Sequence, residues 1–191
     1  MPDTIAEVRA LKYHLVMRPI LSIAAALALM VAVAAAQAKK DTLDGVRNFT
    51  VVDATVACAG ATEIRAVPAL KERGYKSIVN LRQASEPGAN IDETRAAVTS
   101  AGLKFIHLPF NVSAPDELVV DAFLKAVTDP ANQPVFINCG SANRVGGLWL
   151  TKRMLVDGWD EVKALEEAKL IGLSSEPLQK FALSYVAKRK K

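Results

Sequence analysis

A cysteine and an arginine lie five positions apart in the segment 134–149, PVFINCGSANRVGGLW. Cys139 follows a short apolar run typical of a buried strand, and Arg144 begins a segment with helical spacing of its apolar residues. The residues between them are all small: Gly140, Ser141, Ala142 and Asn143. Their N–H groups could converge on one point, and such a loop at a helix N-terminus binds anions and favours a thiolate. The segment therefore predicts an anion-binding loop with Cys139 as nucleophile.

Cleavage of a phosphomonoester needs an ionised nucleophile, donors around the non-bridging oxygens and an acid for the leaving group. Cys139 would be the nucleophile. The loop N–H groups and Arg144 would bind the phosphate, because a guanidinium presents planar paired donors. Asp116 is the candidate acid, since it follows a strand expected at 104–108 and the connection 109–115. Asp116 is equally suited to be the first-turn acid of its own helix.

Three other residues carry chemistry of their own. Arg82, at the end of a strand expected at 76–82, could add positive charge to the phosphate site or form a structural ion pair. Cys58 could form a reversible disulfide with Cys139, or be an inert thiol or part of a permanent disulfide. His107 within its strand indicates a packed histidine. No zinc-ligand spacing links these residues, so we predict no metal and no cofactor.

Strands and helices are expected to alternate along 39–191. A strand or hairpin is expected at 49–57, and strands are expected at 76–82, 104–108 and 134–138. Helices are expected at 62–74, 90–102, 116–128, 144–156, 160–171 and from 175 onward. This alternation predicts one α/β domain with a mostly parallel sheet flanked by helices. Thr62 is the expected N-cap of the first helix, and Pro68 indicates that this helix is kinked or starts late. Ligands bind at the carboxyl ends of such strands, where the Cys139 loop is expected.

The runs KSIVNLR, GLKFIHLPF and NCGSANRVGGLWLTKRMLVDGWDEVKALEEAKLIGL resemble the phosphatase-like domain of the beta-lactamase-hydrolase-like family, a distant relative of tyrosine and dual-specificity phosphatases. The resemblance covers 49–173. It implies a phosphatase-like α/β fold and metal-independent hydrolysis of phosphoesters. By position, Cys139 matches the nucleophile, Arg144 the phosphate-binding arginine, and Asn138 the usual histidine before the cysteine.

Three departures from the tyrosine-phosphatase pattern keep other hypotheses open. Four residues separate Cys139 from Arg144 instead of five, and this shorter spacing occurs in rhodanese-type sulfurtransferases, where the cysteine carries a persulfide. Asn138 replaces a histidine, and Val145 replaces a hydroxyl residue after the arginine. We therefore keep three hypotheses: a cysteine-dependent phosphatase-like hydrolase, a sulfurtransferase with a Cys139 persulfide, and a non-catalytic anion-binding domain.

Residues 1–38 are predicted to be an N-terminal extension and a signal peptide. An uncharged apolar run at 19–38 ends in Ala-Gln-Ala, the pattern of a signal-peptidase site, which predicts cleavage after Ala38 and export to the periplasm or the cell exterior. The alternative is an uncleaved membrane anchor, since the run approaches the roughly 20 residues of a spanning helix. Met17 is a second candidate for the true start.

The predicted exported part, 39–191, ends in a basic tail at 188–191. Removal of 1–38 takes away three basic and two acidic residues, so the formal net charge falls from +4 to +3. Because this net positive charge is small and no aromatic residues alternate with the basic residues of the tail, the tail is expected to be solvated. We therefore predict no nucleic-acid partner. The expected partner is a phosphorylated substrate or another small anion, with a membrane contact only if the N-terminal segment stays uncleaved.

Overall fold

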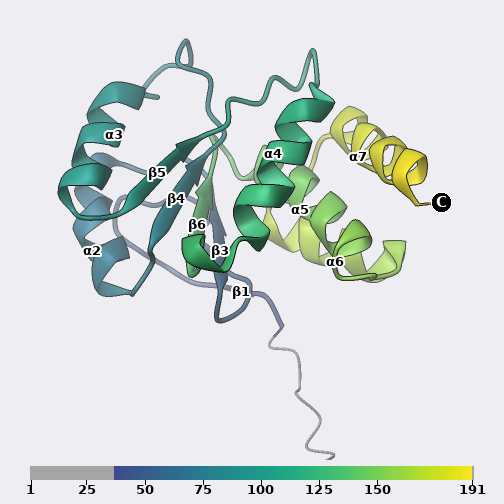
Figure 1. The fold of residues 1–191 in the computed structure, drawn as a ribbon, viewed down its shortest axis with the longest axis horizontal. Helices are drawn as coiled ribbons and strands as arrows, with labels where there is room; N and C mark the ends of the chain where they lie inside the picture. Colours follow the sequence, from purple (N-terminus) through teal and green to yellow (C-terminus); the bar gives the residue numbers. More distant parts are fainter. Residues whose placement is uncertain (1–36, 191) are drawn as a thin grey trace, which may run out of the picture. The chain divides into compact units, whose positions relative to one another are not determined.

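A computed structural model describes residues 37–190 and shows a six-stranded sheet flanked by helices (Figure 1). The strands lie in the order β1 (Lys39–Lys40), β2 (Thr50–Val51), β3 (Val56–Ala59), β6 (Val135–Asn138), β4 (Ser77–Asn80) and β5 (Lys104–His107). The pairs β1–β2 and β2–β3 are antiparallel, and the remaining pairs are parallel. The predicted α/β domain with a mostly parallel sheet is confirmed.

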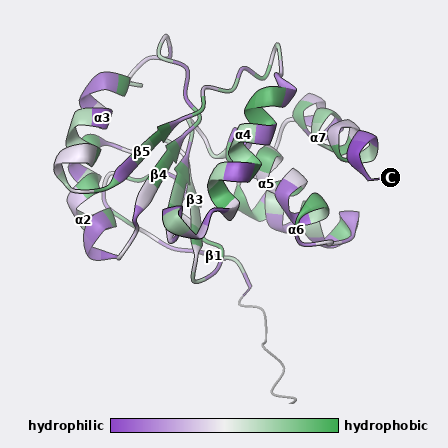
Figure 2. Ribbon diagram, in the orientation of Figure 1, coloured by the Kyte–Doolittle hydropathy of each residue, from purple (hydrophilic) through white to green (hydrophobic). Residues whose placement is uncertain are grey.

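Alternation along the strands divides the core into two parts. Val135 and Ile137 of β6 face one hydrophobic cluster, and Phe136 faces the other. The Phe136 side packs against α2 (Val67–Glu72) and α3 (Ile91–Ser100). Figure 2 shows hydrophobic residues along the central strands and hydrophilic residues on the outer surfaces of these two helices. Both faces of the sheet are therefore covered, as the apolar strand runs predict.

The other side of the sheet carries α4 (Glu117–Thr128) and α5 (Asn143–Leu155), and α6 (Glu161–Ile171) and α7 (Glu176–Arg189) lie beyond α5 (Figure 1). Helix α5 is buried along most of its length, because α6 and α7 pack against it. Its glycines allow this approach: a Cβ at Gly146 would lie 2.7 Å from the Ala168 carbonyl oxygen, and one at Gly147 would lie 2.7 Å from Leu178 Cγ. The Gly-Gly pair thus permits the close packing that fixes the N-terminus of α5.

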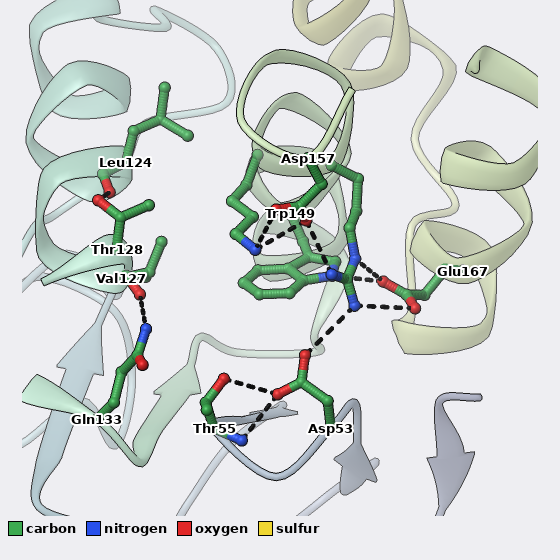
Figure 3. A network of polar contacts seen from close by, with 11 residues as sticks. Asp53, Thr55, Leu124, Val127, Thr128, Gln133, Trp149, Asp157 and Glu167 are labelled. Carbon is green, nitrogen blue, oxygen red and sulfur yellow. Dashed lines mark hydrogen bonds and ion pairs between the residues drawn. The ribbon is translucent and has the colours of Figure 1, made fainter. Parts of the chain in front are cut away.

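A buried ion pair joins α5 to α6 (Figure 3). Arg153 donates to both carboxylate oxygens of Glu167, at 2.6 and 3.2 Å, and Trp149 Nε1 donates to the same carboxylate at 2.6 Å. Asp157 accepts a further bond from Arg153 at 2.8 Å, and Asp53 lies 3.6 Å from the guanidinium. This network lies toward the C-terminal end of α5, whereas the Cys139 loop precedes its N-terminus.

The first helix of the domain confirms one expectation and corrects another. The helix expected at 62–74 starts late, as Pro68 indicates: a 3₁₀ turn, η1 (Ile64–Ala66), precedes the short α2, because Pro68 fits only the first turn of an α-helix. Thr62 is not its N-cap, since its hydroxyl donates to the Gly60 carbonyl at 3.2 Å. The hairpin alternative for 49–57 is confirmed, and its second strand, β3, continues through Cys58 to Ala59.

The predicted signal peptide and the alternative start lie at 1–38, almost entirely outside the described residues. Among residues 37–190, no helix is both long and apolar enough to cross a membrane. Cleavage after Ala38 would make Lys39 the first residue of the mature chain, and Lys39 is also the first residue of β1. The predicted cleavage site therefore coincides with the start of the first strand.

Candidate active site

The Cys139 loop begins at the carboxyl end of β6, between the ends of β3 and β4. The Cys139 N–H donates to the Ala59 carbonyl at 3.3 Å, and the Gly140 carbonyl accepts from the Ala61 N–H at 3.0 Å. Cys139 itself is fully buried. These backbone bonds fix the loop to the neighbouring strand and hold the thiol at the base of the loop.

The backbone donors of the loop are free to bind an anion. Within the described part of the chain, the N–H groups of residues 140–144 form no hydrogen bond with other protein atoms. Ala142, the N-cap of α5, adopts a left-handed conformation with φ of 75°, which turns the chain into the helix. Unpaired N–H groups at a helix N-terminus form a site with partial positive charge. The predicted anion-binding loop at Gly140, Ser141, Ala142 and Asn143 thus has the required donors, while ligand binding by them stays a prediction.

Arg144 is held from one side by three groups. Its Nη1 donates to the carbonyls of Leu81 at 3.0 Å and Phe110 at 3.3 Å. The Glu86 carboxylate accepts from Nη1 at 2.5 Å and from Nη2 at 2.7 Å. Leu81 follows β4 and Phe110 follows β5, so the ends of two neighbouring strands position this guanidinium.

The opposite edge of the guanidinium remains available. Arginine carries five N–H donors, and Nε and one N–H of Nη2 are not needed for the contacts with Glu86 and the two carbonyls. Burial lowers the pKa of Arg144, but the bond to Glu86 and the nearby Cys139 sulfur outweigh burial and raise it. Arg144 therefore stays charged beside Cys139 with a pair of donors whose geometry matches two phosphate oxygens.

Glu86 is a site residue that the sequence analysis does not identify. Besides Arg144, it accepts from the Gln83 N–H at 2.7 Å and from Arg82 Nε at 3.3 Å. Burial raises the pKa of Glu86, but the bonds from Arg144 and Gln83 outweigh it, and the pKa falls to about 2. The sequence signal for Glu86 is its position in the loop that follows the end of β4. A carboxylate in such a loop can supply the counter-charge that a half-buried arginine needs.

The outer side of the loop is braced by Asn48. Its Nδ2 donates to the carbonyls of Ser141 at 3.2 Å and Ile171 at 3.0 Å. Lys40 in β1 donates in turn to Asn48 Oδ1 and to the Ile171 carbonyl. Gly172 packs directly behind Ala142, since a Cβ at Gly172 would lie 2.9 Å from the Ala142 methyl group. Residues far apart in sequence thus fix the back of the loop.

Arg82 braces the loop that follows β4, and its role in phosphate binding stays a prediction. Its Nη1 and Nη2 donate to the carbonyls of Gly88 and Pro87 at 2.7 and 2.6 Å, and Nε contacts Glu86. With all three nitrogens engaged, Arg82 braces the loop that carries Glu86, which is the structural alternative. His107 is packed as expected, with Nε2 2.8 Å from the Arg82 carbonyl oxygen.

Asp116 caps α4, with Oδ1 accepting from the Leu118 N–H at 2.8 Å. The preceding connection contacts the site, because the Phe110 carbonyl accepts from Arg144. Asp116 is exposed. The helix-capping role is therefore confirmed, and the role of Asp116 as an acid in catalysis stays a prediction.

The two cysteines are free and buried, and they lie on the same face of the sheet. Cys58 pairs in register with Ile137, two residues before Cys139. Burial, followed by the negative charge of Glu167, raises the pKa of the Cys58 thiol well above its ordinary value. Cys58 is thus a protonated thiol next to the loop, and its exchange with Cys139 stays a prediction.

Asn138 and Val145 flank the loop without contributing charge to it. Asn138 lies on the Phe136 face, opposite to Cys139, and its buried Oδ1 has no hydrogen-bond partner among the described residues. Val145 is fully buried in α5. Within 37–190, no cluster of three or more His, Cys, Asp or Glu side chains could hold a metal ion.

The comparison with protein families agrees with this geometry. The family model described as "DSP-PTPase phosphatase fused to NAD+ Kinase" matches residues 32–180. The chain belongs to this family. The matched range includes the Cys139 loop, Glu86 and the strands that position them, so the domain is a phosphatase-like hydrolase.

Curated relatives of this DSP-PTPase family member include the dual specificity protein phosphatase TpbA of Pseudomonas aeruginosa (strain UCBPP-PA14). It is 30% identical over 97 residues, which are 50% of this chain and 44% of TpbA. The chain thus matches less than half the length of that relative.

Solved structures share the fold. A putative phosphatase (DUF442) from Shewanella putrefaciens CN-32 superposes with a TM-score of 0.64 at 18% identity, covering 78% of this chain and 98% of that chain. TpbA of P. aeruginosa in complex with phosphotyrosine gives 0.60 at 23%, covering 82% and 91%. The core catalytic domain of the PP-IP phosphatase Siw14 of S. cerevisiae, in complex with citrate, gives 0.62 at 21%, covering 75% and 88%.

Proposed function

We propose that this DSP-PTPase family member is an exported, cysteine-dependent phosphomonoesterase with Cys139 as nucleophile. The observation that carries the proposal is the orientation of Arg144. Glu86 and two carbonyls occupy one side of its guanidinium, and the other edge stays available next to Cys139 and the unpaired N–H groups of 140–144. Such an arrangement matches the three non-bridging oxygens of a phosphoryl group. The proposal also includes a closer relationship of this chain to the phosphatase-like domain of the beta-lactamase-hydrolase-like family.

The reaction would proceed in two displacements. The Cys139 thiolate attacks phosphorus as the bond to the leaving oxygen breaks, and Asp116 gives its proton to that oxygen. Water then attacks the cysteinyl phosphate and gives a proton to Asp116, the S–P bond breaks, and inorganic phosphate leaves. The charge on the transferred group would be stabilised by the loop N–H groups and Arg144 in both steps.

The central experiment measures hydrolysis of p-nitrophenyl phosphate by the reduced protein and by the Cys139→Ser and Arg144→Lys variants. We expect no turnover for Cys139→Ser and about a 100-fold lower kcat/KM for Arg144→Lys, because an ammonium cannot make the bidentate contact. Lys163→Arg, at an exposed position of α6, is a matched control and should act like wild type. Activity that survives Cys139→Ser would refute the proposal.

The role of Asp116 is tested with two leaving groups. Asp116→Asn should lower kcat about 100-fold for an alkyl phosphate, whose leaving oxygen needs a proton, and much less for p-nitrophenyl phosphate. Glu117→Gln serves as the neighbouring control, since Glu117 pairs with Lys188 and Arg189. Equal losses for both substrates would assign Asp116 only to capping α4.

Two further measurements address the remaining parts of the proposal. Export and processing predict that the protein recovered outside the cytoplasm begins at Lys39, which N-terminal sequencing determines. A product retained in membranes with its N-terminal segment would support the anchor alternative. Thiocyanate formation from thiosulfate and cyanide, in the absence of phosphatase activity, would instead support the sulfurtransferase alternative.

A further inference from the structure

The carbonyl groups of the Cys139 loop determine where its N–H groups point. Ser141 and Ala142 are joined by a trans peptide bond. Because such a bond is planar, its C=O and the N–H of the next residue point in opposite directions. A hydrogen bond that fixes a loop carbonyl from outside therefore also fixes the N–H of the residue that follows.

Two consecutive carbonyls of the loop are fixed in this way. The Ala61 N–H donates to the Gly140 carbonyl at 3.0 Å. Asn48 Nδ2 donates to the Ser141 carbonyl at 3.2 Å. Among the described residues, no other side chain donates to a carbonyl of the loop. The direction of the Ala142 N–H thus depends on one side chain, that of Asn48.

The amide of Asn48 has a single orientation that suits its neighbours. Its Nδ2 also donates to the Ile171 carbonyl at 3.0 Å, and its Oδ1 accepts from Lys40 Nζ. Since a carbonyl only accepts and an ammonium only donates, a reversed amide would lose these bonds. The backbone φ of Asn48 is 52°, a left-handed conformation that Asn and Gly adopt most readily. The Nδ2 donor is therefore held toward the loop.

Asn48 and the groups that hold Arg144 lie on opposite sides of the loop. Asn48 precedes β2, and the strands β1 to β3 lie on one side of β6 in the sheet. The two carbonyls that accept from Arg144 follow β4 and β5, on the other side of β6. A Ser141 carbonyl drawn toward Asn48 turns the Ala142 N–H to the opposite side, where the guanidinium lies.

The empty loop needs such a restraint. The N–H groups of residues 140–144 carry like partial charges and form no hydrogen bond with other described protein atoms. If the peptide between Ser141 and Ala142 turned over, this repulsion would fall, but a carbonyl oxygen would then face the anion site and repel phosphate. The hydrogen bond from Asn48 opposes this rotation.

We propose that Asn48 is a positioning residue for phosphate binding: its Nδ2 holds the Ser141 carbonyl so that the Ala142 N–H donates to a phosphate oxygen. The inference rests on the proposed function, because the phosphate must sit on the Cys139 loop. Asn48 acts through the loop and does not touch the substrate. Its loss lowers the affinity of the loop for an oxyanion, whereas a loss of folded protein lowers only the amount of active enzyme.

The test measures kcat/KM for p-nitrophenyl phosphate and the inhibition constant of orthovanadate in two variants. Asn48→Gly removes the donor and keeps the left-handed backbone, and Asn48→Asp keeps the shape and the contact with Lys40 but cannot donate when ionised. For both variants we expect kcat/KM to fall about 30-fold and the vanadate constant to rise by a similar factor, which is less than the typical loss for a deleted oxyanion donor.

Asn90→Gly is the matched control. Asn90 is also left-handed, with φ of 41°, but it is exposed and its side chain forms no capping hydrogen bond. This variant should keep wild-type kinetics and vanadate affinity. The amide proton signal of Ala142 gives a direct reading of the loop: inorganic phosphate should shift it in wild type and in Asn90→Gly, and much less in Asn48→Gly.

The outcomes separate this inference from the proposed function. Unchanged vanadate affinity in Asn48→Gly, with or without a lower kcat, or an effect of Asn48→Asp alone, would overturn the inference and leave the proposed function intact. Failure of wild type to hydrolyse any phosphomonoester would overturn the proposed function. In that case, calorimetric binding of tungstate decides the inference: about tenfold weaker binding by Asn48→Gly supports it, and equal binding, or no binding by wild type, overturns it.

Discussion

Glu86 holds Arg144 through both of its carboxylate oxygens, with Arg144 Nη2 2.7 Å from Glu86 Oε2. The same carboxylate is anchored by the Gln83 N–H and by Arg82. A loop that follows β4 therefore sets the direction of an arginine on α5. Because these contacts orient the donors that Arg144 would present to phosphate, we infer that Glu86 is a positioning residue for the proposed reaction.

Glu86→Gln is expected to lower kcat/KM for p-nitrophenyl phosphate about tenfold, or about 1.4 kcal/mol. A neutral amide offers one acceptor oxygen in place of two and has no negative charge, so Arg144 is less well oriented. Glu93→Gln on exposed α3 is the control and should leave kcat/KM unchanged. Unchanged kinetics for Glu86→Gln would show that Arg144 keeps its orientation without this carboxylate.

The same residue makes stability depend on pH. Burial raises the pKa of Glu86, but its hydrogen bonds, those from Arg144 above all, lower it to about 2 from an ordinary 4.5. A lowered acid pKa stabilises the folded state above pH 4.5, and this contribution is lost as the pH falls toward 2. The difference in unfolding free energy between wild type and Glu86→Gln should therefore shrink over this range. Urea unfolding at several pH values measures it, and a difference that stays constant would contradict the prediction.

Gly172→Ala is expected to lower both stability and activity. Gly172 has φ of 149°, and a Cβ there would lie 2.8 Å from Asn48 Nδ2 and 2.9 Å from the Ala142 methyl group. The clash adds about 1–3 kcal/mol to the backbone strain and displaces the back of the Cys139 loop. Gly158→Ala is the matched control, because φ is 68° there and no atom lies within 4 Å of its Cβ position. Thermal unfolding should show the larger loss for Gly172→Ala, and only this variant should lose activity.

Arg153→Ala should destabilise the domain without a direct effect on the site. The substitution leaves the carboxylate of Glu167 buried with Trp149 Nε1 as its remaining donor, which typically costs about 3–5 kcal/mol. Lys180→Ala breaks an exposed pair with Glu176 and should cost about 0–1 kcal/mol. Denaturant unfolding compares the two variants. A small loss for Arg153→Ala would indicate that the network relaxes around the missing guanidinium.

Mild oxidation should join the two cysteines. Peroxide oxidises the Cys139 thiolate to a sulfenic acid, which condenses with the Cys58 thiol and releases water. Their positions on one face of adjacent strands make a small backbone movement sufficient. We expect activity lost in peroxide to return with dithiothreitol in wild type but to be lost permanently in Cys58→Ser. Mass spectrometry identifies the bond, and equal recovery of both proteins would rule out this exchange.

Much of the sheet and the central loop could be predicted from the sequence, because local signals encode them. The apolar run before Cys139 and the small residues after it show both the strand and the turn. Glu86 could not be assigned in this way, since its partner Arg144 lies on a different element and only the fold brings them together. Arg82 illustrates the converse case: its charge suited either a phosphate-binding residue or a structural ion pair, and only the fold shows that Glu86 and two loop carbonyls contact all three of its nitrogens.

The contact between Lys40 and Asn48 connects the first strand of the domain to the proposed chemistry. Lys40 is bonded to Asn48, and Asn48 is bonded to the Ser141 carbonyl, so the pairing of β1 and the shape of the Cys139 loop stabilise one another. Such coupling is reciprocal. An oxyanion that orders the Cys139 loop would therefore also slow amide hydrogen exchange in β1. Conversely, a bulky group joined directly before Lys39 would disturb β1 and thereby weaken phosphate binding by the loop.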